Sequence, residues 1–148
     1  MSISKINGET IIAAFGGGYS LQGSLASVTF NPTQAAIYYA GGPLTASAAV
    51  TADVRRLYIP KAGTIKSCYA YFNQTASASA NTGTVHIRLN NTTDTLVGTA
   101  VNNATSTRTS NTGLSIAVAQ GDYIEFKWTC PATTAPTNLT SSFIIYIE

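Results

Sequence analysis

Hydrophobic and polar side chains alternate with a period of two in several stretches of this 148-residue chain. In the clearest run, residues 122–130, Ile124, Phe126 and Trp128 fall on one face, whereas Glu125 and other polar or aromatic side chains fall on the opposite face. Such alternation is typical of a β-strand that turns one face toward a hydrophobic core and the other toward solvent. We therefore expect Ile124, Phe126 and Trp128 to belong to the core of the domain.

The rest of the pattern predicts an all-β chain. No window combines apolar residues at helical spacing with charged residues between them, and clusters of Gly, Pro, Asn and Asp separate the alternating runs. Short strands with turns roughly every 8–12 residues are typical of sandwiches, jelly rolls and barrels, and we predict a jelly-roll β-sandwich of about 8–10 antiparallel strands. The expected strands are residues 35–40, 54–59, 64–72, 84–90, 95–101, 113–118, 122–130 and 141–148, with a weaker one at 105–109.

The N-terminal residues differ from the rest of the chain. Residues 15–19 read Phe-Gly-Gly-Gly-Tyr, and the stretch that follows is small and polar. A glycine-rich segment of this kind is typical of a flexible connection. We therefore predict an N-terminal arm over residues 1–27 and a jelly-roll domain over residues 28–148.

Three of the expected strands are apolar on both faces. Ile144 and Tyr146 lie opposite Phe143, Ile145 and Ile147. Ile65, Tyr69 and Tyr71 lie opposite Cys68, Ala70 and Phe72, and Ile37 and Tyr39 lie opposite Tyr38. A sandwich strand needs only one buried face, so a second apolar face indicates either another copy of the chain or loops folded over it. Three copies around one axis would bury this face without leaving an open edge. We predict a homotrimer with Tyr69, Tyr71, Ile144 and Tyr146 at its interface.

Composition narrows the class of function. Only 9% of the residues are charged, the net charge is +2, and 22 Thr, 14 Ser and 10 Asn take the place of charged residues. Eight dispersed cations do not form the basic stripe of a nucleic-acid-binding protein, and 45% hydrophobic residues are too many for a disordered chain. We also expect no membrane insertion and no signal peptide, because no long apolar run and no Sec-type N-terminal pattern are present.

Groups that could support catalysis or metal binding are few. His86, the only histidine, alternates with apolar residues and is expected on a solvated or interface face of its strand. The six carboxylates fall mostly in turns or beside cations, where ion pairing is the expected role; they are Glu9, Asp53, Asp94, Asp122, Glu125 and Glu148. No acid–base pair and no ligand cluster follow from this distribution. We predict no enzymatic activity and no catalytic, cofactor or metal site.

Cysteine and tyrosine leave two questions open. Cys68 and Cys130 lie in separate strand-like runs outside any CxxC pair, so they are either buried free thiols or a disulfide between neighbouring strands. The eight tyrosines and one tryptophan could form a platform for sugar rings, although most of them fall in strands, where core or interface roles are expected.

Several phrases of the sequence resemble a known module. They are residues 55–65 (RRLYIPKAGTI), 87–96 (IRLNNTTDTL) and 121–127 (GDYIEFK), with the closing residues 146–148 (YIE). They resemble a module of tailed-bacteriophage virion proteins, which occurs at the C-terminal ends of tail-fibre and head-decoration proteins, and the resemblance spans about residues 28–148. Residues 114–126, an apolar strand, a Gly-Asp turn and an apolar strand, resemble more weakly the trimeric jelly rolls of complement C1q and tumour necrosis factor.

The resemblance implies a homotrimer on the surface of a phage virion. Such a protein is made in the host cytoplasm, and its N-terminal arm would contact other virion proteins. Its role would be structural, as a decoration, head-fibre or fibre-tip protein. The alternative is a receptor-binding, lectin-like adhesin that recognises a host-surface glycan. The resemblance assigns no receptor-binding residue.

Overall fold

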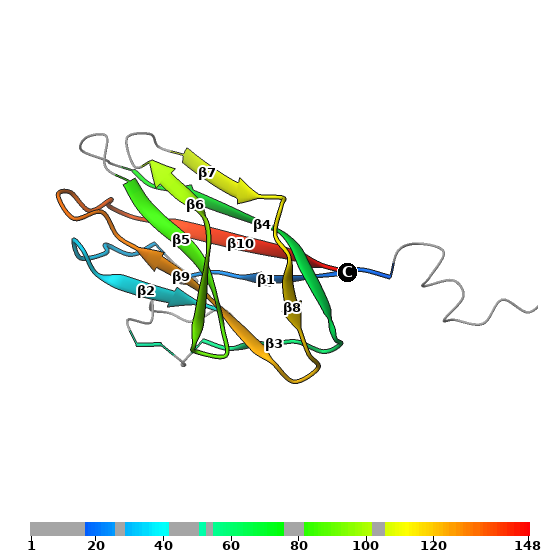
Figure 1. Cartoon of the computed structure of the whole chain (residues 1–148). Coiled ribbons are helices and arrows are strands. Elements are labelled where there is room, and N and C mark those ends of the chain that lie inside the picture. Colours follow the sequence, from blue (N-terminus) through cyan, green and yellow to red (C-terminus); the bar gives the residue numbers. More distant parts are fainter. Residues whose placement is uncertain (1–16, 26–28, 42–50, 53–54, 76–81, 102–105) are drawn as a thin grey trace, which may run out of the picture.

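The computed structural model of the chain describes residues 17–25, 29–41, 51–52, 55–75, 82–101 and 106–148. These residues form ten β-strands and no helix (Figure 1). The strands are β1 (Tyr19–Gly23), β2 (Ile37–Ala40), β3 (Leu57–Tyr58), β4 (Gly63–Asn73), β5 (Thr82–Leu89), β6 (Thr93–Val101), β7 (Ser106–Asn111), β8 (Ile116–Val118), β9 (Tyr123–Thr129) and β10 (Thr140–Ile147). The predicted all-β fold is confirmed.

The strands form two antiparallel sheets that pack face to face. Sheet I has the order β1-β10-β4-β7, with β8 pairing farther along the same edge of β4 as β7. Sheet II has the order β2-β9-β5-β6, with β3 pairing beside β2 along β9. The chain changes sheet at every connection except β2–β3, β5–β6 and β7–β8. The last strand, β10, lies between β1 and β4, and β9 lies between β2 and β5. This strand order makes the architecture a jelly-roll sandwich.

Aromatic side chains from both sheets form the core. Ile124, Phe126 and Trp128, which alternate along β9, are fully buried at 0% exposure. The Phe126 ring stacks on Phe143 of β10 with centroids 4.8 Å apart, and the Trp128 ring lies 5.5 Å from Phe72 of β4. These contacts join sheet II to sheet I directly, so the alternation on β9 sets the side of that sheet on which the core forms.

The N-terminal boundary of the sandwich differs from the predicted one. Residues 19–23 are strand β1, which pairs with residues 143–147 of β10, and Leu25 is buried in the core. The predicted arm over residues 1–27 is therefore too long, because its last part belongs to the domain. Residues 1–16 lie outside the described part of the chain.

A register shift in sheet I corrects one predicted face. Simple alternation places Ile65 on the same side as Tyr69 and Tyr71, but Ile65 is fully buried whereas both tyrosines are exposed. The ladder between β4 and β10 slips by one residue between Tyr146 and Ile147, which pair with Ser67 and Ile65. An extra residue in one strand reverses the inward and outward sides beyond it, so Ile65 joins the core.

Hydrogen bonds join the turns at one end of the sandwich. Asn90 and Asn91 adopt positive φ in the tight β5–β6 turn, a conformation that asparagine tolerates. The Asn90 side chain accepts a hydrogen bond from the Tyr123 N–H at 3.0 Å and donates one to Asp122 Oδ1 at 2.9 Å. The Ile59 N–H donates to the Asp122 carbonyl at 2.7 Å. The three sequence phrases of the virion-module resemblance thus meet at this end, where hydrogen bonds link their turns.

Candidate functional site

The outer face of sheet I carries the largest contiguous group of exposed apolar side chains among the described residues. Tyr69 and Tyr71 of β4 and Ile144 of β10 are 50%, 45% and 39% exposed. Ile144 lies directly opposite Tyr69 in the β4–β10 ladder, and Tyr71 is two residues along on the same face of β4. We call this surface, formed by Tyr69, Tyr71 and Ile144, the aromatic face.

A shallow depression of about 600 Å³ lies on the aromatic face. Arg108 and Ser110 of β7 stand opposite Tyr71 and Tyr69 and extend the depression toward the edge of the sheet. Its full lining is Tyr69, Ala70, Tyr71, Arg108, Thr109, Ser110, Ser142 and Ile144. Two phenol rings, one aliphatic side chain and one cation give this surface the composition of a protein–protein contact, in which Tyr and Arg are enriched.

Polar contacts limit the movement of the Tyr71 ring. The Tyr71 hydroxyl donates a hydrogen bond to Ser106 Oγ at 3.1 Å. The Ser106 hydroxyl in turn donates to Asn73 Oδ1 at 3.3 Å. An exposed aromatic side chain with a satisfied hydroxyl loses little side-chain freedom when another surface covers it.

The fourth predicted interface residue, Tyr146, lies at the margin of this face. It is half-buried, and a Cβ atom on Gly18 would lie 2.3 Å from its hydroxyl oxygen. The chain before β1 therefore covers part of Tyr146, and the glycine at position 18 allows this close approach. The structure brings Tyr69, Tyr71 and Ile144 together and leaves Tyr146 only partly available.

The outer face of sheet II has a different character. Its exposed apolar side chains, Ile37, Leu96 and Tyr58, come from three different strands, β2, β6 and β3. Tyr39, which the sequence placed on a second apolar face, is buried on this sheet. Apolar exposure is therefore dispersed on sheet II and contiguous on sheet I.

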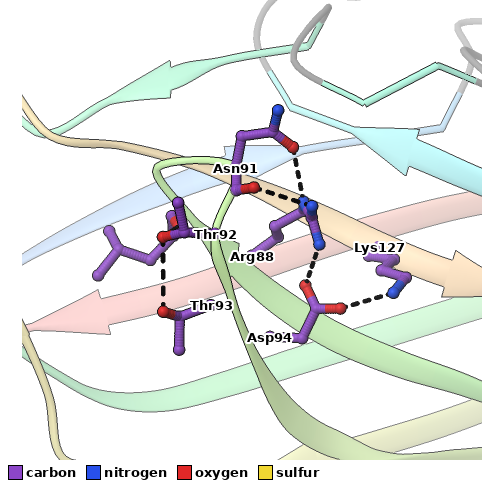
Figure 2. A network of polar contacts seen from close by, with 7 residues as sticks. Arg88, Asn91, Thr92, Thr93, Asp94 and Lys127 are labelled. Carbon is purple, nitrogen blue, oxygen red and sulfur yellow. Dashed lines mark hydrogen bonds and ion pairs between the residues drawn. The ribbon is translucent and has the colours of Figure 1, made fainter.

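Ion pairs connect three strands of sheet II (Figure 2). Asp94 of β6 accepts a hydrogen bond from Arg88 of β5 at 2.8 Å through Oδ1 and one from Lys127 of β9 at 2.5 Å through Oδ2. Arg88 also donates to the side-chain and backbone oxygens of Asn91 at 2.8 and 2.9 Å. Partial burial by itself raises the pKa of Asp94, but the hydrogen bonds and charges of Lys127 and Arg88 hold it below its ordinary value.

Asp94→Asn is expected to remove an acid-sensitive part of the stability. Because the pKa of Asp94 is lowered in the folded state, its contribution is present above the unfolded pKa of about 4 and is lost as the pH falls through the lower, folded value. Urea unfolding should show the variant less stable by about 1 kcal/mol at pH 7, a magnitude typical of exposed ion pairs. The difference should shrink as the pH falls below about 4. An equal difference at pH 7 and at acidic pH would contradict the ion-pair explanation.

His86 and Glu125 lie in different surroundings on sheet II. His86 lies half-buried between Lys127 and Leu96 in the sheet II ladders, and its Nδ1 atom is buried without a hydrogen-bond partner there. Burial is the main cause that lowers the pKa of His86; Asp94 opposes this effect and Lys127 adds to it. Glu125 is fully buried, although alternation placed it on a solvated face, and its Oε1 accepts the Arg55 N–H at 2.9 Å.

The other predicted groups are also placed by the structure. Hydrogen bonds from the Ala119 N–H and from Asn90 hold the pKa of Asp122 low in its turn, while Glu9 and Asp53 lie outside the described residues. Cys68 and Cys130 are buried free thiols, and burial raises their pKa values to about 12 and about 11. Within the described ranges, no three His, Cys, Asp or Glu side chains gather where they could hold a metal ion.

Comparison with known proteins assigns no family. No protein-family model matches the chain, and no curated protein is significantly similar to it in sequence. A search for membrane-spanning helices, limited to the residues that the structure describes, found none that is long and apolar enough.

Sequence reasoning missed the β7 side of the aromatic face. Arg108 and Ser110 belong to the segment Ser-Thr-Arg-Thr-Ser-Asn, which is polar on both faces and predicts only a weak strand. Arg108 and Ser110 lie beside Tyr71 and Tyr69 because β7 pairs with β4. This pairing joins residues about 40 positions apart, which local patterns do not encode.

Proposed function

We propose that the chain is a homotrimeric structural protein displayed on the surface of a bacteriophage virion. The observation that carries the proposal is the aromatic face of sheet I, where Tyr69, Tyr71 and Ile144 form one contiguous exposed group. Soluble monomers rarely leave large apolar patches in water, and a second copy of the same chain is the simplest partner for such a face.

Two further features support assembly of identical copies through this face. The chain has only 14 charged residues to keep a monomer soluble, and the ion pairs of Asp94 with Arg88 and Lys127 lie on the opposite sheet. The lining of the depression on the aromatic face includes a single cation, Arg108, so identical faces meet without a large charge conflict. Threefold closure buries the face in every copy and prevents open-ended growth.

Placement on a virion follows from the resemblance of the sequence phrases to phage virion modules. The jelly-roll order of the strands agrees with the weaker resemblance of residues 114–126 to the trimeric jelly rolls of complement C1q and tumour necrosis factor. In this arrangement the N-terminal segment contacts other virion proteins, and the sandwich points outward. Catalysis has no part in the proposed role.

The oligomeric state is expected to depend on the aromatic face. Light scattering at micromolar concentration should give a molar mass close to three times the chain mass of 15.4 kDa. Tyr69→Glu should reduce it to that of one chain, because burying three carboxylates close to one axis opposes association. Leu96→Glu is the matched control, since Leu96 on sheet II is 51% exposed and Tyr69 50%.

The results can separate the parts of the proposal. A wild-type mass of one chain would overturn assembly, whereas a stable dimer would retain the buried face and reject the threefold axis. Dissociation by Leu96→Glu would move the interface to sheet II. Immunogold labelling of purified phage particles with antibodies against the chain tests display, which absence of label from the particles would refute.

A further inference from the structure

Arg56, Tyr58 and Tyr123 form a cluster on sheet II, which we call the tyrosine platform; Arg56 and Tyr58 are exposed and Tyr123 is half-buried. Tyr58 of β3 lies opposite Tyr123 of β9 in the ladder, and their ring centroids are 5.9 Å apart at an interplanar angle of 57°. The Arg56 guanidinium carbon lies 4.6 Å from the centre of the Tyr123 ring. Arg56 Nη1 also donates a hydrogen bond to the Tyr58 hydroxyl at 3.2 Å.

The Tyr58 ring is both exposed and held in position. It is 57% exposed, the highest value among the large hydrophobic side chains of the described residues. Contacts with the Tyr123 ring and the Arg56 side chain restrict its rotation. An aromatic ring that remains in water despite these contacts offers a flat apolar surface without a further ordering cost on binding.

The backbone beneath the platform is also fixed. The residue after Tyr58, Ile59, donates its N–H to the Asp122 carbonyl at 2.7 Å, and its carbonyl accepts the Gly121 N–H at 2.9 Å. Tyr123 exchanges hydrogen bonds with Asn90 through both its N–H and its carbonyl, each at 3.0 Å. The two aromatic side chains therefore project from backbone that three turns hold in place, which is the condition for a preorganised site.

We propose that the tyrosine platform binds a saccharide. A pyranose ring has an apolar face of C–H groups, which matches the flat Tyr58 ring, and a rim of hydroxyl groups. The Tyr58 hydroxyl and the Arg56 guanidinium lie together at the edge of the platform, where they can hydrogen-bond to those hydroxyls. Apolar stacking thus supplies contact area, and the two polar groups supply orientation.

A single sugar ring fits the platform better than a protein surface does. A stable protein contact covers about 800 Å² on each partner and needs a contiguous centre of anchoring side chains. The other exposed apolar residues of sheet II, Ile37 and Leu96, lie on β2 and β6 rather than beside Tyr58 on β3. One aromatic ring with two polar groups is sufficient for a sugar and too small to anchor a protein.

The platform lies on the sheet opposite the aromatic face, so it stays accessible in the proposed trimer. The three platforms of one trimer would raise the apparent affinity for a repeating polysaccharide through multivalency. This gain in affinity rests on the proposed trimer, whereas binding at a single platform does not.

The test uses the full chain on an array of neutral and acidic hexopyranose oligosaccharides, followed by saturation-transfer NMR with the ligands that bind. Tyr58→Ala should weaken binding by about tenfold or more, and Tyr58→Phe, which keeps the ring, should weaken it less. Leu96→Ala, an exposed apolar substitution on the same sheet, is the matched control and should leave binding unchanged.

The possible outcomes distinguish this inference from the proposed trimer. Absence of binding to every glycan, or equal binding by wild type and Tyr58→Ala, would overturn the saccharide site. In the Tyr69→Glu variant, saturation-transfer NMR should still detect saccharide binding at a single platform, whereas binding to the array should weaken. Loss of both signals would contradict a site that is complete in one copy of the chain. If the wild type bound no glycan and Tyr58→Ala abolished its binding to a defined protein partner, the platform would be a protein-docking surface instead.

Discussion

Replacing Trp128 with alanine is expected to lower the free energy of unfolding by about 3–5 kcal/mol, the range typical of a buried aromatic side chain. The Trp128 ring is fully buried at the centre of the sandwich, with the Phe72 and Tyr38 rings 5.5 and 5.8 Å away. Truncation would leave a cavity between the two sheets that the surrounding strands can fill only in part. Urea or thermal unfolding followed by circular dichroism measures the loss.

The control for Trp128→Ala is Tyr58→Ala, which removes an aromatic ring from the surface. Because Tyr58 is mostly exposed, its loss should cost less than about 1 kcal/mol. Equal effects of the two substitutions would contradict the assignment of Trp128 to the core.

Gly83→Ala is expected to destabilise the protein by about 1–3 kcal/mol through overpacking. A Cβ atom at this position would lie 2.7 Å from the Thr129 carbonyl oxygen and 2.7 Å from Trp128 Nε1. The Thr129 carbonyl belongs to the backbone of the neighbouring strand β9, and the Trp128 side chain is packed in the core. Neither group can therefore move aside easily. Chemical denaturation of the variant provides the measurement.

Gly113→Ala is the matched control for Gly83→Ala. The nearest heavy atom to its added methyl group would be Asn111 Oδ1 at 3.7 Å, an ordinary contact distance. The Gly113 variant should be as stable as wild type, within about 0.5 kcal/mol. If both alanine variants were equally stable, the close packing of Gly83 against β9 would be wrong.

Most strands could be predicted because their local patterns are strong. Nine of the ten coincide with predicted segments to within a few residues, and β9 shows why: apolar side chains alternate along its whole length. β1 was missed because its sequence, Tyr-Ser-Leu-Gln-Gly, is short and follows three glycines. Its conformation comes from pairing with β10, more than 100 residues away.

The aromatic face was predictable in its residues but not in its arrangement. Apolar side chains on both faces of β4 and β10 identified Tyr69, Tyr71 and Ile144, whereas their adjacency depends on the pairing of those two strands. Alternation with a period of two could not predict that Ile65 and Glu125 are buried. The bulge that buries Ile65 is a property of the ladder, and the burial of Glu125 on the outer side of sheet II depends on tertiary packing.

The central positions of β9 and β10 have a consequence for synthesis of the chain. β1 and β4 emerge from the ribosome early, but they cannot share a sheet until residues 140–147 insert between them, and β2 and β5 wait for β9 in the same way. Contacts this distant in sequence make folding slow. During that interval the open strand edges can pair with neighbouring nascent chains. The chain is therefore most vulnerable to aggregation before its last two strands have been made.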